Sequence, residues 1–292
     1  MQNMPINIHF FRAGTQGRIN YQEVLDYFQD LPNFEILYDN DEVDIIYTDD
    51  EFGFQYEYKI TKVSQVKAIY KLDPAYLNIN FMLCLPLLIP GFAVREILEL
   101  TQKMAKTFDL SIYHESFEDV KPFSLADLHS LCECSQRAYL EENGPGDKVL
   151  YDFEKLNVIC KYQRMNENLC ESFHGEVQVN LCTPIIDRRA DEFGICTEWN
   201  IGIPTLFAPY FDFVNIKDED GFEFKIRRAD FMKYMDKYLV KLDVILPDLY
   251  VLKPKQAKAS KSVVNKLRRC QIDDRDFSAL RISDLLDLRT KR

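Results

Sequence analysis

The segment Phe54–Ile60 constrains the fold of this 292-residue chain more than any other. Apolar and polar side chains alternate along it, in the order Phe54-Gln55-Tyr56-Glu57-Tyr58-Lys59-Ile60. Since successive side chains of a strand point to opposite faces of a sheet, one face of this strand is buried and the other is wet. Antiparallel sheets commonly leave one face in solvent, so the pattern predicts an antiparallel sheet.

Helical patterns separate this strand from the other predicted strands. Asn20 and Ser124 are predicted N-caps, because each is followed three residues later by an acidic residue, Glu23 or Asp127. The stretch from Val94 to Phe108 repeats apolar residues at helical spacing. The order of elements predicts an α+β fold with two mainly antiparallel sheet domains, helices packed on one face, and a C-terminal tail with a short helix.

Turn-forming residues divide the predicted domains. At roughly 150 residues per domain, the length favours two domains. The segment Glu141–Asp147 combines Gly, Pro and charge without apolar periodicity, which is typical of a boundary. We therefore expect an α+β domain over 1–143, a second over 150–252, and a basic linker with a terminal helix over 253–292.

Charge and composition bear on partners and location. The net charge of −11 argues against a surface that binds polyanions throughout. No basic segment followed by an apolar block begins the chain, and Phe81–Val94 is too short to span a bilayer. The 8 cysteines occur in a chain long enough to build a core without disulfides, so reduced thiols are expected. The sequence favours a cytoplasmic protein without a membrane span.

The C-terminal part has a different charge from the rest. Seven basic residues and no acidic ones occur over 253–269, namely Lys253, Lys255, Lys258, Lys261, Lys266, Arg268 and Arg269. This segment carries +7, which leaves −18 of the total of −11 on the remainder. A following helix is predicted with an apolar face formed by Phe277, Leu280, Leu285 and Leu288. A basic linker followed by an apolar helix predicts a docking tail, and these eleven residues are the predicted partner-binding set.

One constellation suggests catalysis. Asp50 precedes Glu57 and Lys59, and alternation places the last two on one strand face. A carboxylate ahead of Glu-x-Lys is a pattern with which metal-dependent nucleases hold Mg²⁺ and stabilise phosphoryl charge. The competing interpretation is a solvated strand face, on which paired Glu and Lys are common.

Other candidate sites lack a complete motif. Gly14-Thr15-Gln16-Gly17-Arg18 has neither the Lys-Ser/Thr ending of a P-loop nor dinucleotide spacing. On a helix, Cys132 and Cys134 point to nearly opposite sides, so they do not share a metal with His129. The acidic run Asp187–Glu198 is compatible with a cation site or with a solvated loop. We expect no cofactor and no bound metal.

These observations favour a non-catalytic cytoplasmic interaction protein. It is predicted to bind a protein partner through its C-terminal tail and acidic surface. Two alternatives remain open: a nuclease-like enzyme built on Asp50, Glu57 and Lys59, and a binder of nucleic acid or an anionic surface through 253–269.

Overall fold

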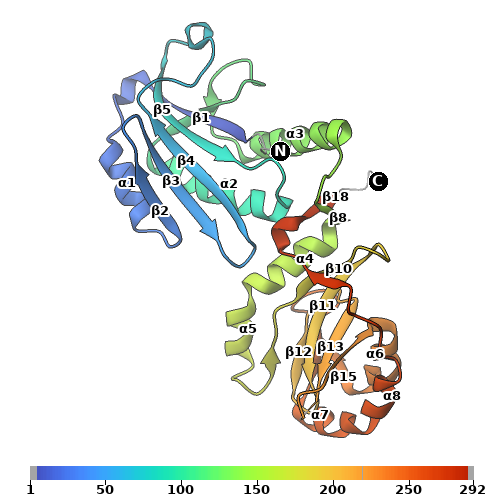
Figure 1. Ribbon diagram of the computed structural model, residues 1–292. Coiled ribbons are helices and arrows are strands. Elements are labelled where there is room, and N and C mark those ends of the chain that lie inside the picture. The colour runs from blue at the N-terminus through green and yellow to red at the C-terminus, as the bar shows by residue number, and fades with distance from the viewer. Residues whose placement is uncertain (1–4, 219, 289–292) are drawn as a thin grey trace. The chain divides into compact units, whose positions relative to one another are not determined.

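The computed structural model describes residues 5–218 and 220–288, and the chain divides into two units (Figure 1). The first unit holds the chain up to Leu150 together with Ser283–Leu286. The second holds Tyr151–Ile282 and the chain from Asp287 onward. Both units mix helices with mostly antiparallel sheets, which confirms the predicted α+β class.

A seven-stranded sheet forms the first unit, in the order β2-β3-β4-β5-β1-β6-β7. Every neighbouring pair is antiparallel. The strands are β1 (Ile6–Ala13), β2 (Phe34–Tyr38), β3 (Glu42–Asp49), β4 (Phe54–Thr61), β5 (Tyr76–Leu85), β6 (Leu110–Tyr113) and β7 (Lys121–Pro122). The predicted strand Phe54–Ile60 is therefore confirmed as β4, near the middle of the sheet.

Helices α1 (Tyr21–Gln29) and α2 (Gly91–Thr107) bury the apolar face of β4 (Figure 1). The ring of Phe28 on α1 lies 4.7 Å from that of Tyr58. The hydroxyl of Tyr58 forms a 2.7 Å hydrogen bond with that of Thr101 on α2. Burying a tyrosine requires such a partner for its hydroxyl. The alternation of β4 thus places its tyrosines under the helices and Glu57 and Lys59 on the opposite face.

The predicted N-caps are also confirmed. The side chain of Asn20 accepts a hydrogen bond from the backbone N–H of Gln22 and donates one to Glu23 at 3.0 Å. The hydroxyl of Ser124 accepts from the N–H of Asp127 at the start of α3 (Leu125–Asn143). The bonds from the N–H groups of Gln22 and Asp127 each satisfy a helix N–H that has no partner within its own helix.

The second unit contains a five-stranded and a four-stranded sheet, in the orders β14-β13-β11-β10-β17 and β15-β16-β12-β9. The strands are β9 (Gln178–Val179), β10 (Thr183–Asp187), β11 (Glu192–Asn200), β12 (Thr205–Phe207), β13 (Phe213–Lys217), β14 (Glu223–Arg227), β15 (Leu239–Lys241), β16 (Tyr250–Leu252) and β17 (Phe277–Ala279). The pairs β11–β13 and β9–β12 are parallel, and the other pairs are antiparallel. The helices are α4 (Phe153–Arg164), α5 (Asn166–Ser172), α6 (Arg228–Met235), α7 (Pro254–Ser260) and α8 (Val264–Arg268).

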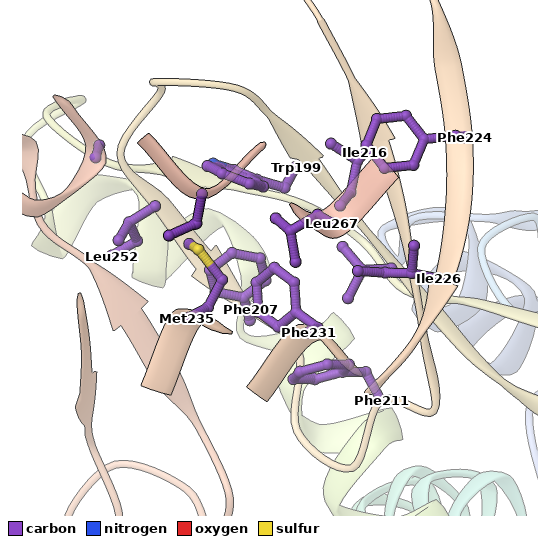
Figure 2. Close-up of a cluster of buried hydrophobic side chains, with 13 residues drawn as sticks. Trp199, Phe207, Phe211, Ile216, Phe224, Ile226, Phe231, Met235, Leu252 and Leu267 are labelled. Carbon is purple, nitrogen blue, oxygen red and sulfur yellow. The ribbon is translucent and has the colours of Figure 1, made fainter. Parts of the chain in front are cut away.

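Aromatic rings from both sheets and from α6 fill the core of the second unit (Figure 2). Trp199, the single tryptophan of the chain, is fully buried there and donates its Nε1–H to the carbonyl of Ile203 at 3.2 Å. The ring of Phe231 on α6 lies 5.1 Å from that of Phe207 and 6.1 Å from that of Trp199. Trp199 is therefore a core residue and does not form part of an aromatic surface.

The predicted basic linker and terminal helix are wrong. Residues 254–268 form α7, a short 3-10 turn over Lys261–Val263, and α8, and they belong to the second unit. The segment expected to be a terminal helix holds β17, a 3-10 turn over Ile282–Asp284, and β18 (Leu285–Leu288), which pairs with β8 (Val149–Asp152). The reason is non-local pairing, which overrides the helical spacing of the leucines.

The apolar residues of the predicted tail are consequently not a free docking face. Phe277 packs edge-on against the ring of Phe213 at 5.2 Å, and the backbone N–H of Leu280 donates to the carbonyl of Pro184. Leu285 has no exposed surface. Leu288 ends β18, and its side chain lies outside the described part of the chain.

Leu285→Ala is expected to lower the free energy of unfolding by about 2–5 kcal/mol, because it leaves a cavity at a fully buried position. Urea denaturation followed by circular dichroism measures the change. Val244→Ala is the matched control: Val244 is fully exposed, so its truncation should change stability by less than about 0.5 kcal/mol. Equal stabilities of the two variants would show that Leu285 lies in a loose tail.

Candidate functional site

Seven cationic side chains lie exposed on one folded stretch of the second unit. They are Lys253, Lys255, Lys258, Lys261, Lys266, Arg268 and Arg269, here called the basic surface. Lys253 caps α7, and the others are carried by α7, the 3-10 turn, α8 and the residue after it. Because no acidic residue interrupts 253–269, their charges reinforce one another.

The apolar side of the same stretch explains why it folds. Pro254 occupies the first turn of α7, where a residue without an N–H costs nothing. Ala257, Val263 and Leu267 recur at near-helical spacing and belong to the buried cluster around Trp199. Ser260 is buried among them, and its hydroxyl donates to the carbonyl of Ala257 at 2.8 Å. One side of the stretch is therefore anchored, and the lysines between the anchors face solvent.

Lys261 packs closely against the turn that follows β11. Gly202 has φ +83°, a conformation that favours glycine. The aliphatic stem of Lys261 lies over it so closely that a Cβ at this position has no room. The side chain of Lys261 is thus held against this turn.

Lys237 and Tyr238, in the 3-10 turn over Asp236–Tyr238 that follows α6, lie beside the basic surface. The hydroxyl of Tyr238 lies 3.4 Å from that of Ser262, and the ammonium of Lys237 lies 4.8 Å from the centre of the tyrosine ring. Hydrogen bonds to Ser262 and Lys237, with the charges of Lys237 and Lys266, lower the pKa of Tyr238. A lowered tyrosine pKa is the response expected of a phenol beside cations.

An exposed aromatic ring lies at the other end of the basic surface. The guanidinium of Arg268 forms an ion pair with Asp218 and lies 5.7 Å from the centre of the ring of Phe222. Phe222 is 51% exposed, so this ring remains accessible beside the cation. The arrangement combines a fixed charge with a flat apolar surface.

The catalytic candidates Glu57 and Lys59 do come together, on the face of the first sheet opposite the helices. The Nζ of Lys59 lies 3.0 Å from Asp44, 3.4 Å from Glu57 and 3.8 Å from Glu42. Burial alone would lower the pKa of Lys59, but the hydrogen bond to Asp44 and the three negative charges raise it. Lys59 is thus a firmly held cation that neutralises these carboxylates.

The third member of that constellation lies elsewhere. Asp50 is exposed in the turn that joins β3 to β4, whereas Glu57 is three residues beyond Phe54 on β4. Three strand residues separate positions by about 10 Å. Asp44, which the sequence pattern did not single out, is the carboxylate opposite Lys59 in register. A nuclease role for Asp50, Glu57 and Lys59 stays a prediction.

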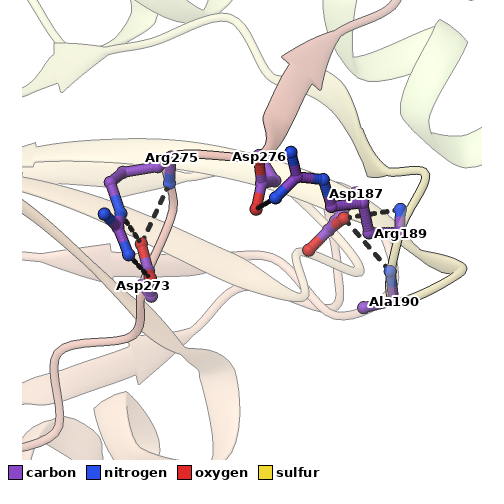
Figure 3. A network of polar contacts seen from close by, with 6 residues as sticks. All are labelled: Asp187, Arg189, Ala190, Asp273, Arg275 and Asp276. Carbon is purple, nitrogen blue, oxygen red and sulfur yellow. Dashed lines mark hydrogen bonds and ion pairs between the residues drawn. The ribbon is translucent and has the colours of Figure 1, made fainter.

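The acidic run after β10 is used in turns and ion pairs (Figure 3). The carboxylate of Asp187 accepts from the backbone N–H groups of Arg189 and Ala190 at 2.8 and 3.2 Å. The guanidinium of Arg189 pairs with Asp276 at 2.9 Å. In the same way, Glu192 pairs with Arg227 of β14. Exposed turn bonds and surface ion pairs are what a solvated loop contains, so these contacts fit that interpretation. Surface ion pairs of this kind contribute little to stability.

A polar network in the second unit was not foreseen from the sequence. Arg228 donates two hydrogen bonds to Asp248, at 2.6 and 2.7 Å, and Asp248 also accepts from the N–H of Tyr210. Tyr210 and Asp248 both have left-handed backbones, with φ of +53° and +61°, which bring the bonds into line. Burial raises the pKa of neighbouring Asp212, whose carboxylate accepts from the N–H of Ile195. No spacing links these residues, because turns distant in sequence bring them together.

His9 is a buried residue of the first sheet, and its pKa is strongly lowered. Burial, and then the charge of His114, lower its pKa from 6.5 to about 4, against a smaller opposing effect of Glu115. In the unfolded chain His9 takes up a proton below about pH 6.5, whereas in the fold it stays neutral until the pH reaches about 4. The stability that neutral His9 gives to the fold above pH 6.5 is therefore lost as the pH falls through about 4.

His9→Gln is therefore expected to reduce the acid sensitivity of the protein. At 1.36 kcal/mol per pKa unit, the shift corresponds to about 3 kcal/mol lost by the wild type between pH 7 and pH 4. Denaturant titrations at both pH values, for both proteins, give the two losses. The same loss in His9→Gln as in the wild type would contradict this assignment.

No family model, curated protein or solved structure matches the chain. Within residues 5–218 and 220–288, no three or more His, Cys, Asp or Glu side chains gather as a metal site. Over the same residues, no helix is long and apolar enough to cross a membrane.

Proposed function

We propose that this protein is a non-catalytic interaction protein that binds an acidic segment of a protein partner through the basic surface. The observation that carries the proposal is the display of seven exposed cations along a folded stretch with a buried apolar side, where Arg268 also pairs with Asp218. A folded surface loses less conformational entropy on binding than a flexible tail does. Complementary charge then steers the acidic segment to the basic surface.

The charge of the rest of the chain favours a short acidic segment over a long polyanion. Outside 253–269, the chain carries −18. Of this charge, residues 151–252 and 270–282 of the second unit carry −7, from 14 basic and 21 acidic residues. A long polyanion that extends beyond the basic surface therefore finds no further excess of cations on this unit, whereas a short acidic peptide needs none.

A second candidate function is the binding of single-stranded nucleic acid. Exposed Phe222 lies beside Arg268, and Tyr238 lies beside Lys237. Aromatic rings that alternate with cations are a common platform on which unpaired bases stack. The positions of these two rings beside cations are the observation that favours this second function.

The proposal also assigns the protein to the cytoplasm. None of the eight cysteines forms a disulfide, and several of them, such as Cys84 and Cys196, are buried. Free buried thiols are typical of proteins that fold in a reducing compartment.

The double variant Lys258→Glu/Lys266→Glu tests the proposal. We expect its affinity for a fluorescent oligoglutamate peptide to fall about tenfold or more, since each reversal replaces an attraction with a repulsion. Fluorescence anisotropy at several salt concentrations measures the affinity, which should also fall as salt rises. Lys103→Glu/Lys106→Glu is the matched control, because it makes the same charge change on exposed positions of α2.

A single-stranded RNA of equal charge serves as the second probe. Tighter binding of RNA than of the peptide, lost in Phe222→Ala, would favour the nucleic-acid function instead. Unchanged peptide affinity in the Lys258→Glu/Lys266→Glu variant, or equal losses in both double variants, would contradict the assignment of the basic surface.

A further inference from the structure

Strand β2 ends the seven-stranded sheet and pairs with β3 alone. The N–H of Asp39 donates to the carbonyl of Glu42 at 3.0 Å, and the N–H of Thr48 donates to that of Asn33 at 3.1 Å. Hydrogen-bonded positions alternate along an antiparallel ladder, so residues 33, 35, 37 and 39 bond to β3. The N–H and C=O groups of Phe34, Ile36 and Tyr38 therefore point to the open edge.

This edge is short and carries one charge, Glu35, but it lacks the stronger devices that usually block pairing. Its sequence, Phe34-Glu35-Ile36-Leu37-Tyr38, contains no Pro or Lys, and its register with β3 runs without a bulge. Leu37 is 45% exposed and Tyr38 is 65% exposed. A straight edge with exposed apolar side chains and three residues' unpaired backbone groups is suited to accept another strand.

We propose that β2 pairs antiparallel with β2 of a second copy of this chain, with Ile36 opposite Ile36 on the two-fold axis. In this register the three residues with open-edge groups meet only one another, Phe34 opposite Tyr38 and Ile36 opposite itself. All three pairs are therefore hydrogen-bonded pairs, and the two sheets continue into one. This inference does not rest on the proposed function.

Side-chain chemistry favours a second copy in this register. Glu35 of one copy lies opposite Leu37 of the other, so its carboxylate does not face a like charge. Phe34 and Tyr38 form cross-strand aromatic pairs at both ends, which are among the favourable pairs in sheets. A foreign strand offers this match only if it repeats the same palindromic pattern.

The geometry also predicts how the association responds to conditions. A five-residue strand is a small interface, and each copy carries −11. The dimer is therefore weak, and added salt strengthens it by screening the repulsion between copies. Binding through the basic surface to an acidic segment has the opposite salt dependence.

Two variants at Leu37 test the register, because they are expected to change the dimer dissociation constant in opposite directions. Leu37→Lys places a cation opposite Glu35 twice in each dimer, and Leu37→Glu places a second carboxylate there. We expect the first to lower the dimer dissociation constant and the second to raise it, each by roughly 2- to 30-fold, from two cross-strand charge pairs. Sedimentation equilibrium of the full chain over a range of concentrations measures the constants, and circular dichroism checks that each variant folds.

If the wild type and the Leu37→Lys variant both stay monomeric, the proposal is overturned, and a strand of another protein becomes the candidate partner of this edge. A dimer with the same constant in both variants would overturn it as well, because the contact then lies elsewhere on the molecule.

Discussion

The burial of Ala257, Val263 and Leu267 in the cluster that holds Trp199 and Phe231 ties the basic segment to the second unit. Without this apolar contact, seven like charges within 17 residues repel one another and favour an extended chain. With it, the lysines between the anchors are held on the outside of two short helices. The proposed function depends on this anchoring, because it converts a charged sequence into a charged surface.

Electrostatics in the rest of the molecule is local. Lys59 neutralises the carboxylates beside it, Arg228 pairs with Asp248, and Arg189 pairs with Asp276. Each of these charges is paired within one or two neighbouring elements. The basic surface differs, because no acidic residue occurs within 253–269 and its seven cations are exposed, one of them, Arg268, paired with Asp218.

Much of the first unit could be predicted from the sequence because its signals are local. Alternation marks β4, and the caps Asn20 and Ser124 mark the starts of α1 and α3. The same alternation correctly placed Glu57 and Lys59 together, although it gave no information on Asp44, which arrives from β3 through pairing.

The C-terminal part was mispredicted for two physical reasons. The anchors of 254–268 include the small residues Ala257 and Ser260, which contribute little to hydrophobic periodicity among many lysines. The leucines at 285 and 286 belong to a strand, and a strand's pairing with β8, more than 100 residues earlier, leaves no trace in local spacing. Local periodicity therefore missed the helices of 254–268 and mistook the strand at 285–288 for part of a helix.

Amide hydrogen exchange of the full-length protein, read by mass spectrometry, tests the anchoring most directly. The structure predicts that peptides covering Ala257–Leu267 exchange slowly, with protection close to that of core strand β13. Exchange of these amides at the rate of an unstructured peptide, while β13 stays protected, would contradict the folded basic surface and the function proposed for it.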